Sequence, residues 1–369
     1  MVEAVVVDDS QFMRVQIREI LEEGGISVVG EAHNGNAAID AVATHRPDVV
    51  TMDVKMPGMD GIEAVEHIMA EHPTPILMLS RYTEEGSDVT FEALEVGAVD
   101  FFPKPDDGST TLVKYADELV EAARVVARAD VSTSDTGARS DAGTRSTDPS
   151  AARESHAQPT VERDEPTAAN ATLVIAASTG GPSVVQSIME RLPVGVGLRI
   201  LVVQHMPEHF TERFAKRLDT FSTYDVSEAT DGMTVGTDEA VVARAGYHLV
   251  VTDDLGGELH LELSEADAVN NVRPAADVTM ESAGTAVDGP LVAVVLTGMG
   301  RDGAVGLEHV NAAGGTTLVQ SPESADLDSM PRNAIETGAV DETVSEEAMP
   351  QRILDAVEQL SRGTSEGPE

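Results

Sequence analysis

LVIAASTGGPSVV, residues 173–185, is the stretch that decides the fold of the C-terminal half of this chain. Its first five residues are apolar, as in a strand buried on both faces, and Pro182 then opens a segment with helical spacing. A buried strand that leads directly into a helix is one part of a βαβ unit, which predicts a parallel sheet covered by helices. Ser178 stands at the turn between them, where it could start the helix, bind a phosphate or attack a substrate.

The rest of the C-terminal half repeats this alternation, so we expect residues 171–363 to form a doubly wound, mainly parallel α/β domain. Short strands crowded between residues 225 and 263 suggest an antiparallel excursion inside that sheet. The expected strands are LVIAAS, RILVVQ, AVVAR, YHLVVTD, ELHLEL, LVAVVLT and TTLVQ, and helices are expected after Pro182, Pro207, Pro274, Asp302 and Pro331.

Residues 1–128 alternate strands and helices in the same way, with the expected strands EAVVVD, ISVVGE, PDVVTMD, PILMLS and AVDFFP. This pattern predicts a five-stranded, flavodoxin-like (βα)5 domain. Residues 129–170 lack any periodicity and are rich in Ser, Thr, Asp, Arg, Ala and Pro. Such a segment buries too little apolar surface to offset its ordering entropy, so we expect a flexible linker between the two domains.

The composition excludes several classes of protein. The 369-residue chain has no Cys, so we expect no disulfide, no thiolate metal site and no cysteine nucleophile. No apolar run approaches the roughly 18 residues of a membrane span, and the first residues lack the basic region of a signal peptide. We therefore expect a cytoplasmic protein without membrane insertion.

The charge balance is strongly acidic, with 65 Asp and Glu against 24 Lys and Arg and a net charge of −41. A surface of this sign repels phosphates, so nucleic acid is not an expected partner. The repulsion between these charges is screened within about 3 Å at molar ionic strength, which favours a protein adapted to a very salty cytoplasm. An acidic mesophilic protein is the alternative interpretation.

A first group of polar residues follows the expected strands of the N-terminal domain. Asp8 and Asp9 end the first strand and Asp53 the third, while Ser80 and Lys104 end the fourth and fifth. The carboxyl ends of parallel strands meet at one edge of the sheet, so three carboxylates would converge there and favour Mg²⁺ as a companion. The alternative is that an aspartate of "DDS" only caps the following helix.

The motifs VVVDDSQFMR, VVTMDVKMPGMDGIEA, PILMLS and GAVDFFPKP resemble the response-regulator receiver domain over about 125 residues. The resemblance implies that Asp53 accepts a phosphoryl group from a histidine kinase and that Asp8 and Asp9 bind Mg²⁺ beside it. It also implies that Ser80 and Lys104 sense the phosphoryl oxygens. Phe101 holds the family's rotating aromatic position.

A second group stands in the C-terminal domain, where Ser178, His205 and Asp302 each lie just past an expected strand. A hydroxyl becomes a nucleophile when a base takes its proton and a carboxylate orients that base, and these three residue types meet the requirement. The two glycines after Thr179 would let backbone N–H groups approach an oxyanion at a helix N-terminus, and the sequence TGMG at 297–300 would offer more such donors.

Simpler interpretations of the same residues remain open. Ser178 or Thr179 could cap the following helix, and STGG could cradle a phosphate, although its spacing is that of neither a GxGxxG motif nor a P-loop. His205 could be structural, with His209 or His248 as the working histidine.

The motifs ASTGGP, VVQHMP and LTGMGRDGA, preceded by a receiver and a linker, resemble the protein-glutamate methylesterases of chemotaxis, the CheB family. The resemblance implies a Ser178–His205–Asp302 triad that hydrolyses γ-glutamyl methyl esters on chemoreceptors and deamidates receptor glutamines, with no cofactor for the ester chemistry. It also implies that Met299 supplies a backbone donor to the oxyanion of the reaction and that Thr179 lies beside the nucleophile as a further oxyanion residue.

Two positions depart from the usual family pattern: Ala177 stands where Gly is often found, and Arg301 where a small polar residue is common. Arg301 could lower the pKa of the neighbouring Asp302 carboxyl or draw that carboxylate aside. The alternative function is that of a response regulator with a non-enzymatic α/β output domain that binds an anion or a protein.

Overall fold

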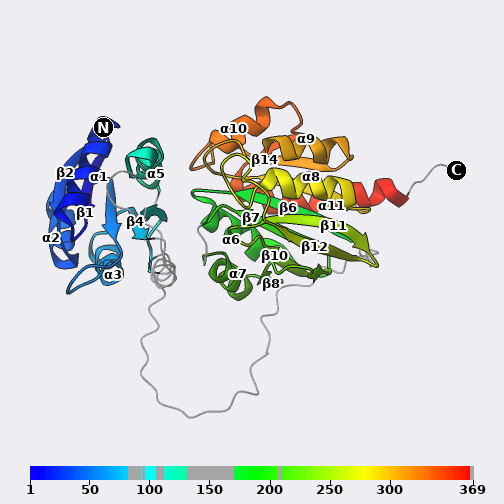
Figure 1. Cartoon of the computed structure of the whole chain (residues 1–369), viewed down its shortest axis with the longest axis horizontal. Helices are drawn as coiled ribbons and strands as arrows, with labels where there is room; N and C mark the ends of the chain where they lie inside the picture. The colour runs from blue at the N-terminus through cyan, green and yellow to red at the C-terminus, as the bar shows by residue number, and fades with distance from the viewer. Residues whose placement is uncertain are drawn as a thin grey trace, which may run out of the picture.

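A computed structural model describes residues 1–81, 93, 96–104, 112–129, 131, 170–206 and 210–365, without the side chains of a few of these, Ser80 among them. Two α/β domains are present, with the N-terminal one in blue and cyan beside the larger C-terminal one (Figure 1). The segment expected to be a linker lies outside the described residues except at its two ends. None of the described helices has the length and apolar character needed to cross a membrane.

The N-terminal domain is a five-stranded parallel sheet in the order β2-β1-β3-β4-β5, which confirms the predicted doubly wound topology. Its strands are β1 (Glu3–Val7), β2 (Ser27–Ala32), β3 (Val49–Asp53), β4 (Ile76–Arg81) and β5 (Asp100–Lys104). Its helices are α1 (Gln11–Glu23), α2 (Gly35–His45), α3 (Gly61–Glu71), the 3-10 turn η1 (Leu112–Tyr115) and α5 (Ala116–Val126).

The residue that caps α1 is Ser10, whose hydroxyl accepts a hydrogen bond from the backbone N–H of Met13. The extended backbone of Ser10 and its small polar side chain are typical of an N-cap. Neither Asp8 nor Asp9 serves as the helix cap, so both carboxylates are left for another role at the strand end.

The C-terminal domain is built on a seven-stranded sheet in the order β15-β14-β13-β6-β7-β10-β8, and every neighbouring pair in it is parallel. The sheet strands are β6 (Ala171–Ala177), β7 (Leu198–Gln204), β8 (Asp225–Glu228), β10 (Glu239–Val242), β13 (Leu291–Val295), β14 (Thr316–Gln320) and β15 (Glu342–Val344). The helices are α6 (Gly181–Arg191), α7 (Phe210–Phe221), α8 (Ala276–Ala286), α9 (Ala304–Ala312), α10 (Ser329–Glu336) and α11 (Met349–Ser365), with the 3-10 turn η2 (Glu346–Ala348) before α11.

The prediction of an antiparallel excursion inside the parallel sheet is wrong in its placement. Three antiparallel strands form a separate sheet in the order β11-β12-β9, with bounds β9 (Thr234–Val235), β11 (His248–Leu255) and β12 (Glu258–Ser264). The hairpin turns at Gly256 and Gly257, both with positive φ, so a two-residue turn fixes antiparallel pairing here. Strands β8 and β10 of the same region instead join the edge of the parallel sheet.

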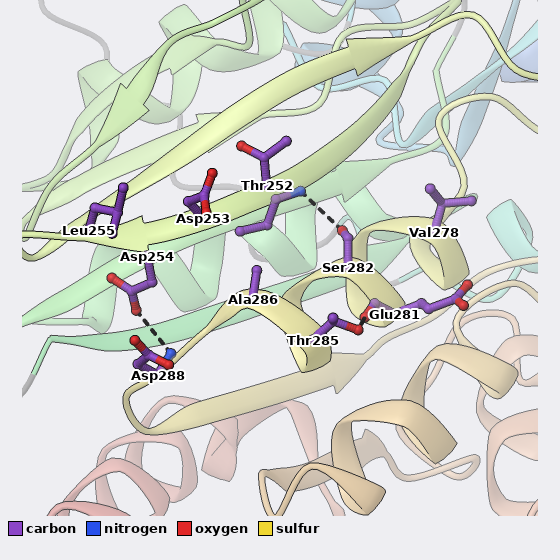
Figure 2. Close-up of a pocket in the computed structure, with 11 residues that line it drawn as sticks. Thr252, Asp253, Asp254, Leu255, Val278, Glu281, Ser282, Thr285, Ala286 and Asp288 are labelled. Atoms are coloured by element: carbon purple, nitrogen blue, oxygen red, sulfur yellow. Dashed lines mark hydrogen bonds between the residues drawn. The ribbon is translucent and has the colours of Figure 1, made fainter.

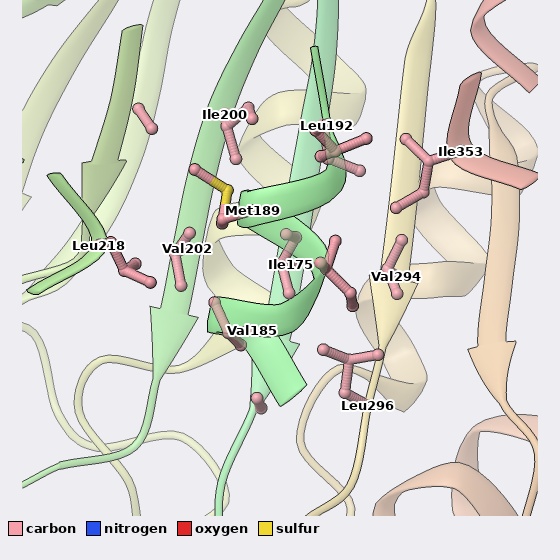
Figure 3. Packing of buried hydrophobic residues seen from close by; sticks show 14 of the residues in the cluster. Ile175, Val185, Met189, Leu192, Ile200, Val202, Leu218, Val294, Leu296 and Ile353 are labelled. Carbon is pink, nitrogen blue, oxygen red and sulfur yellow. The ribbon is translucent and has the colours of Figure 1, made fainter. Parts of the chain in front are cut away.

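Aliphatic packing on both faces of the large sheet holds β6 in a fixed place. All seven residues of β6 and of β7 are buried. On one face, Val185 and Met189 of α6 pack over β6 and β7, and Ile353 of α11 lies beside β13 (Figure 3). Burial of each such side chain contributes about 1.5–3 kcal/mol, so the end of β6 is held by a rigid support.

Candidate functional site

Ser178 lies at the centre of the seven-stranded sheet, at its carboxyl edge. Strand β6 pairs with β13 on one side and with β7 on the other. The chain continues from β6 to β7 and from β13 to β14, so the connections after β6 and after β13 run in opposite directions along the sheet. Ala177 is in register with Gln204, which places Ser178 beside His205 at the ends of neighbouring strands. Gly298, after β13, lies so close that an added Cβ would stand 2.6 Å from the Ser178 Cβ. Doubly wound sheets bind ligands at such a point.

Asp302 meets His205 at this edge. The Nε2 atom of His205 lies 2.8 Å from Asp302 Oδ2, although the two residues are 97 positions apart in the chain. Asp302 is 2% exposed, and its oxygens also accept hydrogen bonds from the backbone N–H groups of Ala276 (2.6 Å) and Asp277 (3.2 Å). Both N–H groups belong to the first turn of α8, whose own N-cap, Ala275, has no side-chain acceptor.

These contacts keep the Asp302 carboxylate charged. Burial alone would raise its pKa, but the hydrogen bond and charge of His205, together with the two backbone N–H groups, lower the pKa below its ordinary value. A charged carboxylate beside Nε2 fixes the imidazole tautomer that carries its proton there. The Nδ1 atom of His205 is then the nitrogen with a free lone pair. The structure records no hydrogen bond between Ser178 Oγ and this ring, as is common in free enzymes.

Two backbone N–H groups near Ser178 have no acceptor. In the segments 178–181 and 298–300, all of which the structure describes, every N–H is hydrogen-bonded except those of Thr179 and Met299. The glycines are engaged, because the Gly181 N–H donates to Ser178 O and the Gly180 N–H to Asp100. Donors to an oxyanion are available at Thr179 and Met299 instead.

His205 itself offers no free backbone donor, because its N–H donates a hydrogen bond to Ala177 O at 3.0 Å. This bond continues the pairing of β6 and β7 past the end of β7. Its side chain is nonetheless the histidine that contacts Asp302. Both ring nitrogens of His248 have other partners: Nδ1 accepts a hydrogen bond from the Ala275 N–H, and Nε2 is hydrogen-bonded to Asp267 O. His248 is therefore a structural histidine. His209 lies outside the described residues.

The capping role considered for this turn finds no support. The N-cap position of α6 is Gly180, at φ 78°, and no side chain caps the helix, so neither Ser178 nor Thr179 serves as its cap. Arg301 is exposed and forms no ion pair with Asp302, which instead turns into the protein.

Sequence reasoning missed Gln204, the last residue of β7. Its buried side-chain amide donates to Ser178 O at 2.7 Å and to His205 O at 3.2 Å. A single side chain therefore holds the backbone of both residues. A glutamine directly after the apolar run ILVV of a buried strand was the available signal, because a polar group is retained in such a place only when it is hydrogen-bonded.

The N-terminal domain gathers its acidic residues as expected. Ligand atoms of Asp8, Asp9 and Asp53 lie within 4.8 Å of one another at the carboxyl edge of the sheet. The Nζ atom of Lys104 lies 2.5 Å from Asp8 Oδ2 and 2.8 Å from Asp53 Oδ1. Burial raises the pKa of Asp53, Lys104 opposes that rise, and Asp8 and Asp9 add to it. Clustered carboxylate oxygens of this kind fit Mg²⁺, which prefers hard oxygen ligands.

Strand β5 connects this acidic edge to the C-terminal domain. Lys104, at the end of the strand, binds Asp53, while the buried carboxylate of Asp100, at its start, accepts a hydrogen bond from the Gly180 N–H at 2.9 Å. The ring of Phe101 stacks on Phe210 of α7 with centroids 4.9 Å apart. The side chain of Ser80, the remaining predicted residue of this group, lies outside what the structure describes.

One pocket lies apart from these groups. It has a volume of about 560 Å³ and lies between β11 and α8 (Figure 2). Its wall is acidic, with Asp253, Asp254, Glu281 and Asp288, and Asp254 is already paired with the buried guanidinium of Arg199. Neither Ser178 nor His205 lines it, so the pocket does not belong to the candidate site.

Comparisons with known proteins give concordant results. The family described as CheB methylesterase matches residues 173–353, and the response regulator receiver domain matches residues 4–116. The protein-glutamate methylesterase/protein-glutamine glutaminase of Natronomonas pharaonis is 52% identical over 355 residues, covering 96% of this chain and 97% of that protein. The protein of the same name from Haloarcula marismortui is 48% identical over 360 residues, covering 96% and 98%. The crystal structure of the Thermotoga maritima CheB methylesterase catalytic domain is 36% identical and covers 50% of this chain and 97% of that one, with a TM-score of 0.47.

Proposed function

The chain belongs to the CheB methylesterase family, as its motifs predicted, and carries a receiver domain, so we propose that it demethylates chemoreceptors under the control of phosphorylation. Its substrates are γ-methyl esters of receptor glutamates, and receptor glutamines are deamidated at the same site. The observation that carries the proposal is the 2.8 Å contact between His205 and Asp302 beside the strand end that bears Ser178.

The chemistry follows from the hydrogen bonds at the site. Ser178 Oγ attacks the ester carbonyl carbon while Nδ1 of His205 takes the hydroxyl proton, because Nε2 is held by Asp302. The resulting oxyanion accepts hydrogen bonds from the Thr179 and Met299 N–H groups, the two near Ser178 without an acceptor. The imidazolium then protonates the leaving methoxide. Methanol departs, and water activated by His205 hydrolyses the acyl-enzyme to glutamate; with a glutamine substrate, ammonia departs instead.

The receiver supplies the control. A histidine kinase transfers its phosphoryl group to Asp53, and Asp8 and Asp9, with Asp53, would hold the Mg²⁺ that neutralises charge during the transfer. Phosphorylation adds about −1.5 to −2 charges at pH 7 beside Lys104, with Ser80 as the second phosphoryl-sensing residue. Since Lys104, Phe101 and Asp100 share strand β5, a change at Asp53 reaches the contacts with Gly180 and Phe210. These contacts block Ser178 in the unphosphorylated chain and loosen on phosphorylation.

The partners in this proposal are methylated chemoreceptors as substrate and the chemotaxis histidine kinase as phosphodonor. Both reactions take place in the cytoplasm. The ester chemistry uses no cofactor, because nucleophile, base and oxyanion donors are all groups of the chain.

The experiment that tests the function measures methanol release from a methylated receptor fragment by the wild type and by Ser178→Ala, each with Mg²⁺ and a small-molecule phosphodonor. We expect release by the wild type and none by the variant. Equal rates would remove Ser178 from the mechanism. A fluorophosphonate probe gives an independent readout, since it should label Ser178 in the wild type but not in His205→Ala. Wild-type protein that stays unlabelled and releases no methanol would favour a binding-only output domain.

A further inference from the structure

Among the described residues, Asp302 has one side-chain donor besides His205, and this donor is the exposed residue Asn270. The Nδ2 atom of Asn270 lies 3.0 Å from Asp302 Oδ1 and 2.7 Å from Asp277 Oδ2. An amide nitrogen carries two hydrogens, so it can donate one to each carboxylate. Asn270 thereby joins the carboxylate that faces His205 to a second, neighbouring carboxylate.

The second carboxylate makes this bridge necessary. Asp277 is 7% exposed, and burial raises its pKa, with the charge of Asp302 adding to the rise and the hydrogen bonds from Gly306 and Asn270 opposing it. Asp277 and Asp302 both contact the Nδ2 atom of Asn270, so the two buried carboxylates lie close together and repel each other. The donor between them lets both stay ionised. Without it, Asp302 would either share a proton with Asp277 or turn away from it.

The backbone of Asn270 holds its amide in this place. Val269 and Val272 form an isolated antiparallel bridge, and the two residues between them, Asn270 and Asn271, have φ values of 53° and 64°. Two consecutive residues with positive φ are typical of a type I′ turn, in which Asn is among the favoured residues. The Asn270 amide is therefore presented to Asp302 by a short, fixed turn.

We propose that Asn270 is a positioning residue of the triad: its amide orients the Asp302 carboxylate so that Oδ2 faces His205, and separates it from Asp277. The inference rests on the proposed function, since it concerns the same His205–Asp302 pair. Asn270 acts through Asp302 and does not itself react with the substrate.

The adjacent Asn271 supplies a matched control. It is exposed, has the same positive φ and makes no recorded side-chain hydrogen bond in the described part of the chain. Glycine suits a positive φ, so Asn270→Gly and Asn271→Gly keep the turn while only the first removes the amide bridge. Asn270→Asp keeps the size and the turn preference but has no N–H to donate at neutral pH.

The test compares kcat and KM for methanol release by the full-length variants, with a methylated receptor fragment, Mg²⁺ and a small-molecule phosphodonor. We expect kcat to fall about tenfold in Asn270→Gly and in Asn270→Asp, with KM unchanged, because a displaced Asp302 misaligns the base. Asn271→Gly should stay within twofold of the wild type, and melting temperatures should show that both glycine variants remain folded at the assay temperature.

Three results would overturn the inference. Near-wild-type kcat in Asn270→Asp would show that only the turn matters, and equal loss in Asn270→Gly and Asn271→Gly would show the same. A rise in KM at constant kcat in Asn270→Gly would make Asn270 a substrate contact. Ser178→Ala, assayed in parallel, reports on the proposed function separately, because it remains inactive if only the role of Asn270 is wrong.

Discussion

Asp100 of the receiver strand β5 and Gly180, two residues after Ser178, are joined by a hydrogen bond of 2.9 Å that is buried from solvent. The carboxylate occupies the N-terminal end of α6, where backbone N–H groups attract anions. A group of the receiver thus binds to the same turn that carries the proposed nucleophile. The stacked rings of Phe101 and Phe210 extend this contact.

The first prediction concerns this contact. Asp100→Ala removes the acceptor of the Gly180 N–H, so the unphosphorylated chain should release methanol severalfold faster than the wild type. Asp117→Ala, which removes an exposed carboxylate of α5, should leave the rate unchanged. A phosphodonor should bring the wild type and both variants to similar maximal rates. If Asp100→Ala is as slow as the wild type without phosphodonor, the contact does not restrain the enzyme.

A second prediction follows from the titration of Asp100. Burial raises its pKa to about 6, with the backbone hydrogen bonds from Phe101 and Gly180 opposing the rise and Asp326 adding to it. When the domains separate, the pKa returns toward its ordinary value of 3.8. The contact therefore binds a proton between these values: it is most stable at low pH and weakens as the pH rises through about 6.

The measurement compares the unphosphorylated full chain with a fragment that starts at residue 170, which should be active without a phosphodonor. The ratio of the full-chain rate to the fragment rate should increase between pH 5 and pH 7. Asp326, which also faces Gly180, is present in both proteins, so its titration affects both rates. Asp100→Asn should make the ratio nearly independent of pH. A fragment slower than the unphosphorylated full chain at every pH would contradict the inhibition itself.

The sequence was sufficient to predict which polar residues meet at the carboxyl ends of the strands. Asp8, Asp53, Ser178 and His205 each follow an apolar run, and in a parallel sheet the ends of such runs share one edge. The alternation of strands and helices likewise gave both domains. These features depend on local patterns and on one topological rule, so a single sequence contains them.

Contacts between distant segments could not be predicted in the same way. Asp100 lies 80 residues from Gly180, and Asn270 lies 32 residues from Asp302, with no periodicity connecting either pair. The resemblance named Thr179 and Met299 as oxyanion residues, but only the hydrogen bonds of their neighbours show that these two N–H groups have no acceptor. The separate antiparallel sheet was missed because strand patterns do not state which partner a strand will choose.

A third prediction tests Gln204, whose amide holds the carbonyl groups of Ser178 and His205. Gln204→Met keeps the length of the side chain but removes both donors and leaves the His205 carbonyl without its partner. We expect kcat to fall about tenfold or more and the free energy of unfolding to decrease by about 1–3 kcal/mol. Gln186→Met, the same change on α6 away from the site, is the control for urea unfolding and methanol release. Equal effects of the two substitutions would argue against a special role for Gln204.

The last prediction concerns salt, and it is motivated by the net charge of −41 together with the halophilic relatives from Natronomonas and Haloarcula. Repulsion among 65 acidic residues destabilises the folded chain, and molar salt reduces the screening distance to about 3 Å. The melting temperature should therefore rise between 0.1 M and 2 M KCl.

The exposed acidic residues Glu19, Glu22 and Glu23 lie in the last two turns of α1, and the last turn has no basic side chain to offset the negative end of the helix dipole. Their combined replacement by Gln should raise the melting temperature at 0.1 M KCl and reduce the increase produced by salt. This control separates charge screening from general salt effects on apolar burial, which the triple variant would retain unchanged. A salt response that is identical in the two proteins would assign the stabilisation to apolar burial, and a melting temperature that does not rise with KCl would exclude adaptation to a salty cytoplasm.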